Sequence, residues 1–230
     1  MTASDTRAPV APIVAPSSER VLRHTLFDRL YHWLMAASVL TLMGTAFLPI
    51  VGIKFEWLSL HWMTGIGLTV LVLIHIVRAL IWQDWRAMIL DGADIRDGLR
   101  KFRAALGSSG PAPGKPGKYK IAQKLYHLAV AVLVLAIIVS GLLMLLKIDT
   151  PFWKRNPYWF DSDTWGIIYS VHGFASMAMI TLVMIHIYFA LRPEEWWLTR
   201  SMFRGWITGK EYLDHCDSGR WTASDTAGKG

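Results

Sequence analysis

The sequence predicts an all-α membrane protein built as a four-helix transmembrane bundle, and two observations lead to this fold class. Of the 230 residues, 53% are apolar and only 18% are charged, whereas a soluble domain usually carries about 25% charged residues. In addition, four windows contain no Asp, Glu, Lys or Arg: 30–53, 57–77, 125–146 and 164–191. Each window reaches the roughly 20 residues with which a helix crosses the hydrocarbon core of a bilayer. The composition excludes a soluble globular enzyme, and the single cysteine excludes a secreted domain stapled by disulfides.

The basic residues are distributed unevenly around these windows. Four spans place both termini on the same side, and 20 of the 24 Lys and Arg residues lie on that side. The other four lie in the two opposite connections: Lys54, Lys147, Lys154 and Arg155. Because positive charge accumulates on the inner side of a membrane, both termini are predicted to be cytoplasmic. The formal net charge of +7 is therefore a topology signal, and no nucleic-acid partner is expected.

The windows divide the chain into three parts. Residues 1–18, rich in Ala, Pro and Ser, are expected to be a disordered N-terminal tail, and they lack the basic-then-apolar layout of a signal peptide. The four-span domain covers 19–212, with spans at about 30–53, 57–81, 125–146 and 164–191 and an inner loop at 82–124; residues 213–230 are a C-terminal cytoplasmic tail. In the inner loop, apolar residues from Trp85 to Leu106 recur at helical spacing among arginines. This pattern predicts an amphipathic helix that lies on the inner membrane face and contacts lipid.

Six of the eight histidines lie in or at the ends of the predicted spans, where an ionisable side chain is costly and indicates function. They are His32, His61, His75, His127, His172 and His186. The second span carries His61 and His75, and the fourth carries His172 and His186 at the same interval. This interval of about 14 residues is nearly four helical turns and rises about 21 Å, so each helix carries two histidines on one face at two membrane depths.

Two layers of facing imidazoles are what two stacked b-type haems need, because each iron takes two axial imidazoles while the flat ring fills the space between helices. Glycines near the outer histidines would let that ring approach the backbone, although small residues also mediate ordinary helix packing in membranes. Other histidines have simpler interpretations. His127 fits an interfacial residue, and His75 fits either a haem site or a hydrogen-bonded neighbour, whereas His24 and His215 are expected to be solvated.

The two halves of the chain show a faint internal repeat. Residues 30–32 and 125–127 both read Leu-Tyr-His at the start of a span, and each such span precedes a helix with the same interval between its two histidines. This repeat predicts two related helical hairpins. Repeat symmetry alone would pair His75 with His186 at the inner depth.

Several motifs resemble a known family. Residues 29–33 (Arg-Leu-Tyr-His-Trp) are similar to the Arg-x-x-His-Trp opening of the membrane cytochrome b (gamma) subunits of respiratory formate dehydrogenases. That superfamily also includes the b-type cytochromes of nickel–iron hydrogenases and thiosulfate reductases. Further similarity lies at 117–119 (Gly-Lys-Tyr), 169–172 (Tyr-Ser-Val-His), 185–188 (Ile-His-Ile-Tyr) and 204–210 (Arg-Gly-Trp-Ile-Thr-Gly-Lys). The likeness covers residues 20–212 in order.

The resemblance implies two b haems. His61 and His172 would hold the iron of the outer haem, the same pair that the spacing suggested. His32 and His186 would hold the inner haem, in contrast to the pairing that repeat symmetry favours. His75 is then an alternative inner ligand or a neighbour of the inner haem.

The resemblance also implies a site for a quinone, either menaquinone or ubiquinone, beside the inner haem. Lys120, Gln123 and His186 are the residues expected to contribute to it. The family usually reads Gly-Lys-Tyr-Asn-x-Gly-Gln-Lys at 117–124. Here Gln123 is kept, but Lys120 replaces the Asn and Ala122 replaces the second Gly.

By resemblance, the chain is a respiratory electron-transport subunit of a bacterial inner (plasma) membrane and not an enzyme on its own. It would pass electrons between an iron–sulfur subunit, itself supplied by a molybdenum- or tungsten-containing catalytic subunit, and the quinone pool. The nearest alternative is the same role for a hydrogenase or a sulfur-oxyanion reductase. A different class is a haem-free membrane anchor or a small transporter. For the latter, the sequence offers no proline-broken span, because its prolines lie at span ends and in loops.

Overall fold

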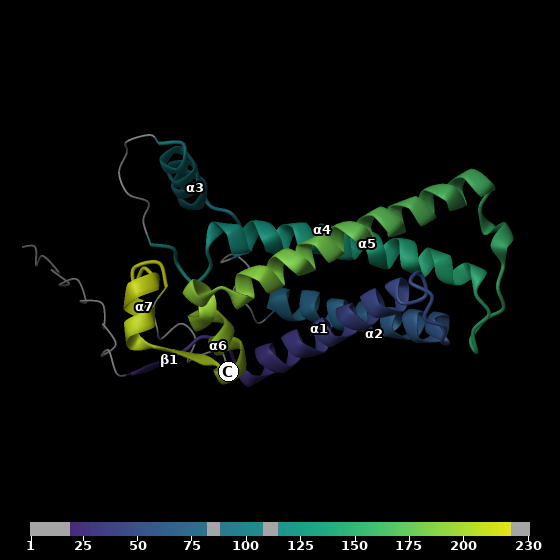
Figure 1. Cartoon of the computed structure of the whole chain (residues 1–230), viewed down its shortest axis with the longest axis horizontal. Coiled ribbons are helices and arrows are strands. Elements are labelled where there is room, and N and C mark those ends of the chain that lie inside the picture. Colours follow the sequence, from purple (N-terminus) through teal and green to yellow (C-terminus); the bar gives the residue numbers. More distant parts are fainter. Residues whose placement is uncertain (1–18, 82–87, 108–114, 222–230) are drawn as a thin grey trace, which may run out of the picture.

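A computed structural model of the chain describes residues 19–81, 88–107 and 115–221. Four of its helices are long and apolar enough to cross a membrane, as predicted: α1 (Leu26–Phe47), α2 (Trp57–Ile81), α4 (Ile121–Met144) and α5 (Ser162–Leu191). Figure 1 shows that α1 and α2 form one hairpin and that α4 and α5 form a second, which lies against the first. We call the end of the bundle with the connections 48–56 and 145–161 the loop end, and the opposite end, which carries β1 and α7, the terminal end.

The first span differs from its predicted bounds of 30–53. Helix α1 begins four residues earlier because Thr25 caps it: the Thr25 hydroxyl accepts from the Asp28 amide at 3.2 Å, and the Asp28 carboxylate accepts from the Thr25 amide at 3.1 Å. The helix ends at Phe47, because the chain turns where Gly52 adopts a φ of +91°. Residues 48–53 are apolar, but they form this turn and not helix, so the predicted end of the span is corrected.

Helix α2 has the predicted bounds of 57–81, whereas α4 and α5 begin at polar caps just outside their apolar windows. Helix α4 starts four residues before its window, where the Gln123 side chain accepts from the Lys120 amide at 2.9 Å. Helix α5 starts after Asp161, whose side chain accepts from the Thr164 amide at 2.8 Å. It ends before Pro193, which begins a short 3-10 turn (Pro193–Glu195).

A small folded unit packs at the terminal end. Strand β1 (Arg20–Leu22) pairs antiparallel with β2 (Trp206–Thr208), and helices α6 (Trp196–Arg204) and α7 (Gly209–His215) flank this ribbon. Their buried side chains share one core: Val21, Trp197, Ile207, Tyr212, Cys216 and Trp221. The predicted boundary at residue 212 therefore falls inside α7, and residues 213–221 are folded where a tail was expected. The predicted tail at 1–18 and residues 222–230 lie outside the described part of the chain.

Arg23 lies at the centre of this unit. Its guanidinium is 5.3 Å from the ring centres of both Trp197 and Trp221, and it donates to the Lys118 carbonyl at 2.7 Å. Next to it, His24 is half-buried, in contrast to the predicted solvated residue. Burial and the neighbouring cations Arg23 and Lys118 lower the pKa of His24 to about 3. The other histidine expected to be solvated, His215, is exposed as predicted, and its ring stacks on Trp197 with ring centres 4.6 Å apart.

Gly205 joins this unit to the start of α1. It ends α6 with a left-handed φ of +88°, and its carbonyl accepts from the amides of Arg23 and His24 at 2.8 and 2.9 Å. A Cβ at this position would lie 2.9 Å from the His24 carbonyl oxygen. Glycine is therefore required here both by conformation and by space.

Helix α3 (Gly92–Ala105) occupies the inner loop, where a helix was predicted. A buried ion pair attaches it to α4: Asp94 Oδ2 lies 2.5 Å from Lys124 Nζ, and both side chains are less than 10% exposed. Asp94 also accepts from Arg220 at 2.9 Å. The apolar side chains of α3 are more than half exposed, namely Ile95, Leu99 and Phe102. Contact of α3 with the membrane stays a prediction, and Trp85, expected to belong to the same helix, lies outside the described residues.

The Asp94 ion pair yields a stability prediction. Changing Asp94 to Asn leaves the buried ammonium of Lys124 without its counter-charge, which costs about 3–5 kcal/mol when such a pair is broken. The thermal unfolding midpoint of the purified protein, followed by circular dichroism, should fall accordingly. Asp149→Asn is the matched control, because Asp149 and Arg155 are 53% and 67% exposed and 3.8 Å apart. Its expected effect is below about 1 kcal/mol, and equal shifts for both variants would contradict the prediction.

The same carboxylate gives a pH dependence. Burial raises the pKa of Asp94, but hydrogen bonds from Lys124, the Asp91 amide and Arg220 outweigh burial and leave the pKa below its usual value. A lowered carboxyl pKa stabilises the fold above the unfolded value of about 3.9, and this stabilisation is lost as pH falls. Between about pH 5 and pH 3, the wild-type protein should therefore lose more stability than Asp94→Asn.

Candidate functional site

The candidate site is a set of histidines that face one another across the two hairpins. At the loop end, the rings of His61 (α2) and His172 (α5) have centres 6.4 Å apart at an interplanar angle of 70°. At the terminal end, the rings of His32 (α1) and His186 (α5) have centres 6.3 Å apart at 54°. The structure thus brings together both pairs that were predicted as outer and inner axial ligands.

A third pair lies at the terminal end. The rings of His75 (α2) and His127 (α4) have centres 6.2 Å apart at 56°. The pairing of His75 with His186, which repeat symmetry suggested, is therefore not the one that the fold makes. His127 meets His75 across the hairpins, but its side chain is exposed, so the interpretation of this residue as interfacial stays a prediction.

Buried hydroxyls orient the loop-end pair. His61 Nδ1 lies 2.8 Å from Thr45 Oγ1, and His172 Nδ1 lies 3.0 Å from Ser140 Oγ. Each hydroxyl donates its one hydrogen to the carbonyl four residues earlier in its own helix, at 2.9 Å from Thr45 and 2.6 Å from Ser140. A hydroxyl oxygen that has donated its hydrogen can only accept, so Nδ1 of each imidazole carries the proton and Nε2 keeps a lone pair. Metal-binding histidines are commonly oriented by such a contact.

The spacing of the pairs suits a metal held between two imidazoles. With metal–nitrogen bonds of about 2 Å and a ring centre roughly 1.1 Å beyond each nitrogen, two imidazoles on opposite sides of one metal have centres about 6 Å apart. Among the described residues, no three His, Cys, Asp or Glu side chains gather as a metal-binding group. A bis-imidazole pair therefore fits a metal that brings its other ligands, as haem iron does.

One glycine makes room for a histidine ring, whereas the predicted approach of a haem to the glycines stays a prediction. A Cβ at Gly141 would lie 3.2 Å from Cε1 of the His172 ring, so a side chain there would press on the imidazole. At Gly44 and Gly65 a Cβ would only touch a leucine at 4.0 Å, and at Gly173 it would meet nothing within 4 Å. Contacts within the described part of the chain therefore do not require glycine at these three positions.

Tyrosines cover the terminal-end pairs and confirm the internal repeat. Tyr31 stacks on His75, with ring centres 5.8 Å apart, and Tyr126 stacks on His186 at 5.5 Å. Each tyrosine hydroxyl donates to the carbonyl four residues before its histidine, that of Leu71 or Leu182. The two hairpins therefore repeat the same local contacts.

The hydroxyl residues that contact His61 and His172 also occur at equivalent positions of the repeat. Thr45 follows His32 in the first hairpin by the same interval at which Ser140 follows His127 in the second. The sequence analysis did not identify these hydroxyls, because it considered the histidines alone. The matching interval is the sequence signal that could have revealed them.

Charge distinguishes the two terminal-end pairs. One turn before His32, Arg29 donates to the Phe203 carbonyl, and its buried Nε has no hydrogen-bond partner in the described part of the chain. The corresponding cation before His127 is Lys124, which is paired with Asp94. Of these two cations, Arg29 on the His32 side is therefore the one that keeps a buried donor for an additional anionic group.

Two residues predicted for a quinone site already have partners. The Lys120 ammonium contacts both carboxylate oxygens of Glu195, at 2.6 and 2.7 Å. The Gln123 carbonyl caps α4, which leaves the amide hydrogens of Gln123 as donors. Glu195 was not anticipated, and it neutralises the cation that replaces the family's Asn.

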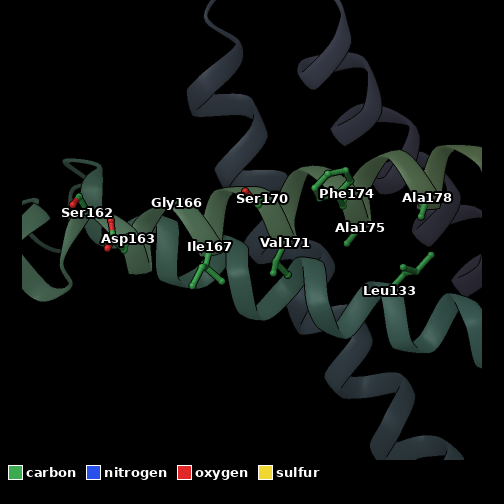
Figure 2. A pocket seen from close by; sticks show the side chains of 10 residues that line it. All are labelled: Leu133, Ser162, Asp163, Gly166, Ile167, Ser170, Val171, Phe174, Ala175 and Ala178. Carbon is green, nitrogen blue, oxygen red and sulfur yellow. The ribbon is translucent and has the colours of Figure 1, made fainter.

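An open groove of about 860 Å³ runs along the loop-end half of α5 (Figure 2). Nine of its ten lining residues come from α5, and Leu133 comes from α4. None of the six histidines lines it. The groove lies on a different face of α5 from His172 and is separate from the candidate site.

The fold and the paired imidazoles define a class of protein: a membrane-embedded helical bundle suited to haem held by two histidines. A family model described as prokaryotic cytochrome b561 matches residues 23–205. The chain belongs to the prokaryotic cytochrome b561 family. It is a bacterial membrane cytochrome with an electron-transfer role, and membership implies haem b.

Curated relatives bear the name "Formate dehydrogenase, cytochrome b556(fdo) subunit" in Escherichia coli K12, O6:H1 and O157:H7. Each is 23% identical over 206 residues, which cover 83% of this chain and 87% of the relative. The resemblance to the formate dehydrogenase cytochromes stated from the motifs is thereby confirmed.

The orienting hydroxyls provide a test of the loop-end pair. Thr45→Val and Ser140→Ala each remove the acceptor for a histidine Nδ1, and loss of such a contact typically weakens metal binding by about 10–100-fold. Haem retained per chain after dialysis against apomyoglobin should therefore fall in both variants. Thr69→Val is the matched control, because the Thr69 hydroxyl contacts a carbonyl of its own helix and no histidine. Wild-type haem retention in both test variants would contradict the role assigned to these hydroxyls.

Proposed function

We propose that the chain is a di-haem b-type cytochrome subunit that passes electrons between an iron–sulfur partner subunit and the membrane quinone pool. The observation that carries this proposal is the pair of cross-hairpin imidazole contacts at two depths of one bundle, with centres 6.3 and 6.4 Å apart. When bound, haem iron supplies reversible one-electron chemistry, while the chain supplies ligation, spacing and a low dielectric. Two haems, one near each end of the bundle, would let electrons cross the membrane in two steps.

We assign the loop-end haem to His61 and His172 and the terminal-end haem to His32 and His186. Geometry alone does not choose between the His32 pair and the His75 pair, because their ring centres are 6.3 and 6.2 Å apart. Charge supports the choice, since Arg29 beside His32 retains a buried donor without a partner in the described part of the chain. That donor would serve a haem propionate.

The quinone site is proposed at the terminal end, beside His186. Gln123 is the better candidate for a hydrogen bond to a quinone oxygen, since its amide hydrogens remain as donors. Lys120 would have to share its ammonium between the quinone and Glu195. Because Glu195 already pairs with Lys120, we assign Lys120 only a secondary part in binding the quinone.

We infer that the terminal end faces the cytoplasm, because 20 of the 24 Lys and Arg residues lie on that side. Both termini would then be cytoplasmic in a bacterial inner (plasma) membrane. Electrons would enter at the loop end from the iron–sulfur subunit, which a molybdenum- or tungsten-containing catalytic subunit supplies. Inward electron transfer works against the membrane potential at about 2.3 kcal/mol per charge per 100 mV.

The name of the curated relatives supports a formate dehydrogenase complex as the setting. The same cytochrome could instead serve a hydrogenase or a sulfur-oxyanion reductase, and the chemistry that distinguishes these lies on another chain. Co-purification of the tagged chain from native membranes, followed by identification of its partner subunits, separates the alternatives. A molybdopterin-containing partner that oxidises formate is the expected result.

Haem counting tests the ligand assignment. A pyridine haemochrome assay on the purified protein should find two non-covalent b haems per chain, in line with two bis-imidazole sites. His61→Ala or His172→Ala should each leave one haem, and so should His32→Ala or His186→Ala. His75→Ala and His127→Ala should keep both. A colourless folded preparation would exclude a cytochrome, and loss of haem only in the His75 variant would move the inner ligand to that residue.

A further inference from the structure

The His75–His127 pair has no role in the function proposed above, although it places two ionisable side chains within the spans, His75 half-buried and His127 exposed. Its surroundings are acidic on one side and aromatic on another. Asp28 and Tyr31 approach His75 from α1, and His127 approaches it from α4. On the same helix as His75, Arg78 lies one turn away. The groups around His75 are therefore a carboxylate, a cation, a phenol and a second imidazole.

The ion pair beside His75 lies at the rim of the bundle. Arg78 NH1 is 2.6 Å from Asp28 Oδ1, and the two side chains are 21% and 27% exposed. Asp28 belongs to the first turn of α1 and so lies at the terminal end. A carboxylate that is partly open to solvent thus lies at the terminal end, near enough to His75 to act on its charge.

On the side of His127, the pair lies next to a residue of the proposed quinone site. His127 follows Gln123 by four residues in α4, so the two side chains lie on one face of the helix, one turn apart. The ring nitrogens of His75 and His127 make no hydrogen bond to a protein group within the described residues, in contrast to the fixed nitrogens of His61 and His172. Imidazoles without fixed partners can accept a proton at one nitrogen and release one from the other.

We propose that His75 and His127 relay protons from the terminal-end surface, past Asp28, to the quinone that is reduced beside His186. This inference rests on the proposed function. Reduction of one quinone to quinol takes two electrons, which the two proposed haems would supply, and two protons, one for each quinone oxygen. Each proton leaves an imidazolium of the pair, and water at the Asp28 rim returns it. No other oxidant or reductant is needed.

The test measures quinol formation without partner subunits. Full-length protein in lipid nanodiscs is reduced with dithionite, mixed with a soluble benzoquinone or naphthoquinone in a stopped-flow device, and followed by haem absorbance. His127→Gln and His75→Gln should reoxidise at least roughly tenfold more slowly at about pH 8.5, because general acid catalysis at one site contributes this much or more. The defect should shrink at about pH 6, where free protons substitute for the relay. Added imidazole should restore part of the rate.

Two controls separate a relay from a structural role. His215→Gln alters a histidine that stacks on Trp197 outside the bundle, and it should leave reoxidation unchanged. Haem content and midpoint potentials of the His75 and His127 variants should match the wild-type protein. Wild-type rates in both variants across the pH range would overturn the relay, and so would loss of a haem from either. If the reduced wild-type haems do not react with quinone at all, the proposed function itself fails.

Discussion

The constraint on which the bundle depends is that lipid offers an imidazole no hydrogen-bond partner, so any partner of its ring nitrogens must come from the protein, from water or from a bound group. At the loop end, a hydroxyl oxygen accepts a hydrogen bond from Nδ1–H of each histidine, which leaves Nε2 for the proposed metal. Thr45 and Ser140 are 3% and 4% exposed, and each comes from the neighbouring helix of its own hairpin. The two hairpins must then face each other with their histidines at one depth. In the proposed function, ligation would therefore constrain how the spans pack.

The internal repeat explains why the terminal end has two histidine pairs and the loop end has one. His61 and His172 are repeat equivalents of each other, so their pair maps onto itself. The His32 pair maps instead onto the His75 pair, which is why the two have nearly equal ring distances of 6.3 and 6.2 Å. The repeated arrangement therefore places a second imidazole pair at the terminal end, and the surrounding charges distinguish the two pairs. Arg29, whose Nε lacks a partner within the described residues, favours an anionic cofactor, whereas an Asp28–Arg78 rim favours proton exchange.

Much of the fold could be predicted because its signals are local. Charge-free windows long enough to cross a bilayer fix the four spans, and the shared interval between histidines fixes their depths. The partner of His75 could not be predicted, because spacing along a helix does not say which neighbour lies across the interface. The end of α1 was misplaced because the turn after Phe47 is as apolar as the helix. The folded unit around Arg23 was missed because its contacts join residues from opposite ends of the chain, such as Val21 and Trp221.

That unit also explains why two distant family signatures occur together. The segment before α4 is held by the chain beyond the last span: Lys115 donates to the Leu213 carbonyl at 2.6 Å, and the Asp217 amide donates to the Pro116 carbonyl at 2.9 Å. A Cβ at Gly117 would lie 3.3 Å from the Arg220 carbonyl oxygen, so the glycine of the Gly-Lys-Tyr motif permits close packing against this segment. The residues that shape the entry to α4 therefore include several that follow β2. The Gly-Lys-Tyr and Thr-Gly-Lys motifs belong to one structural unit, and a change in either is transmitted to the terminal end of the bundle.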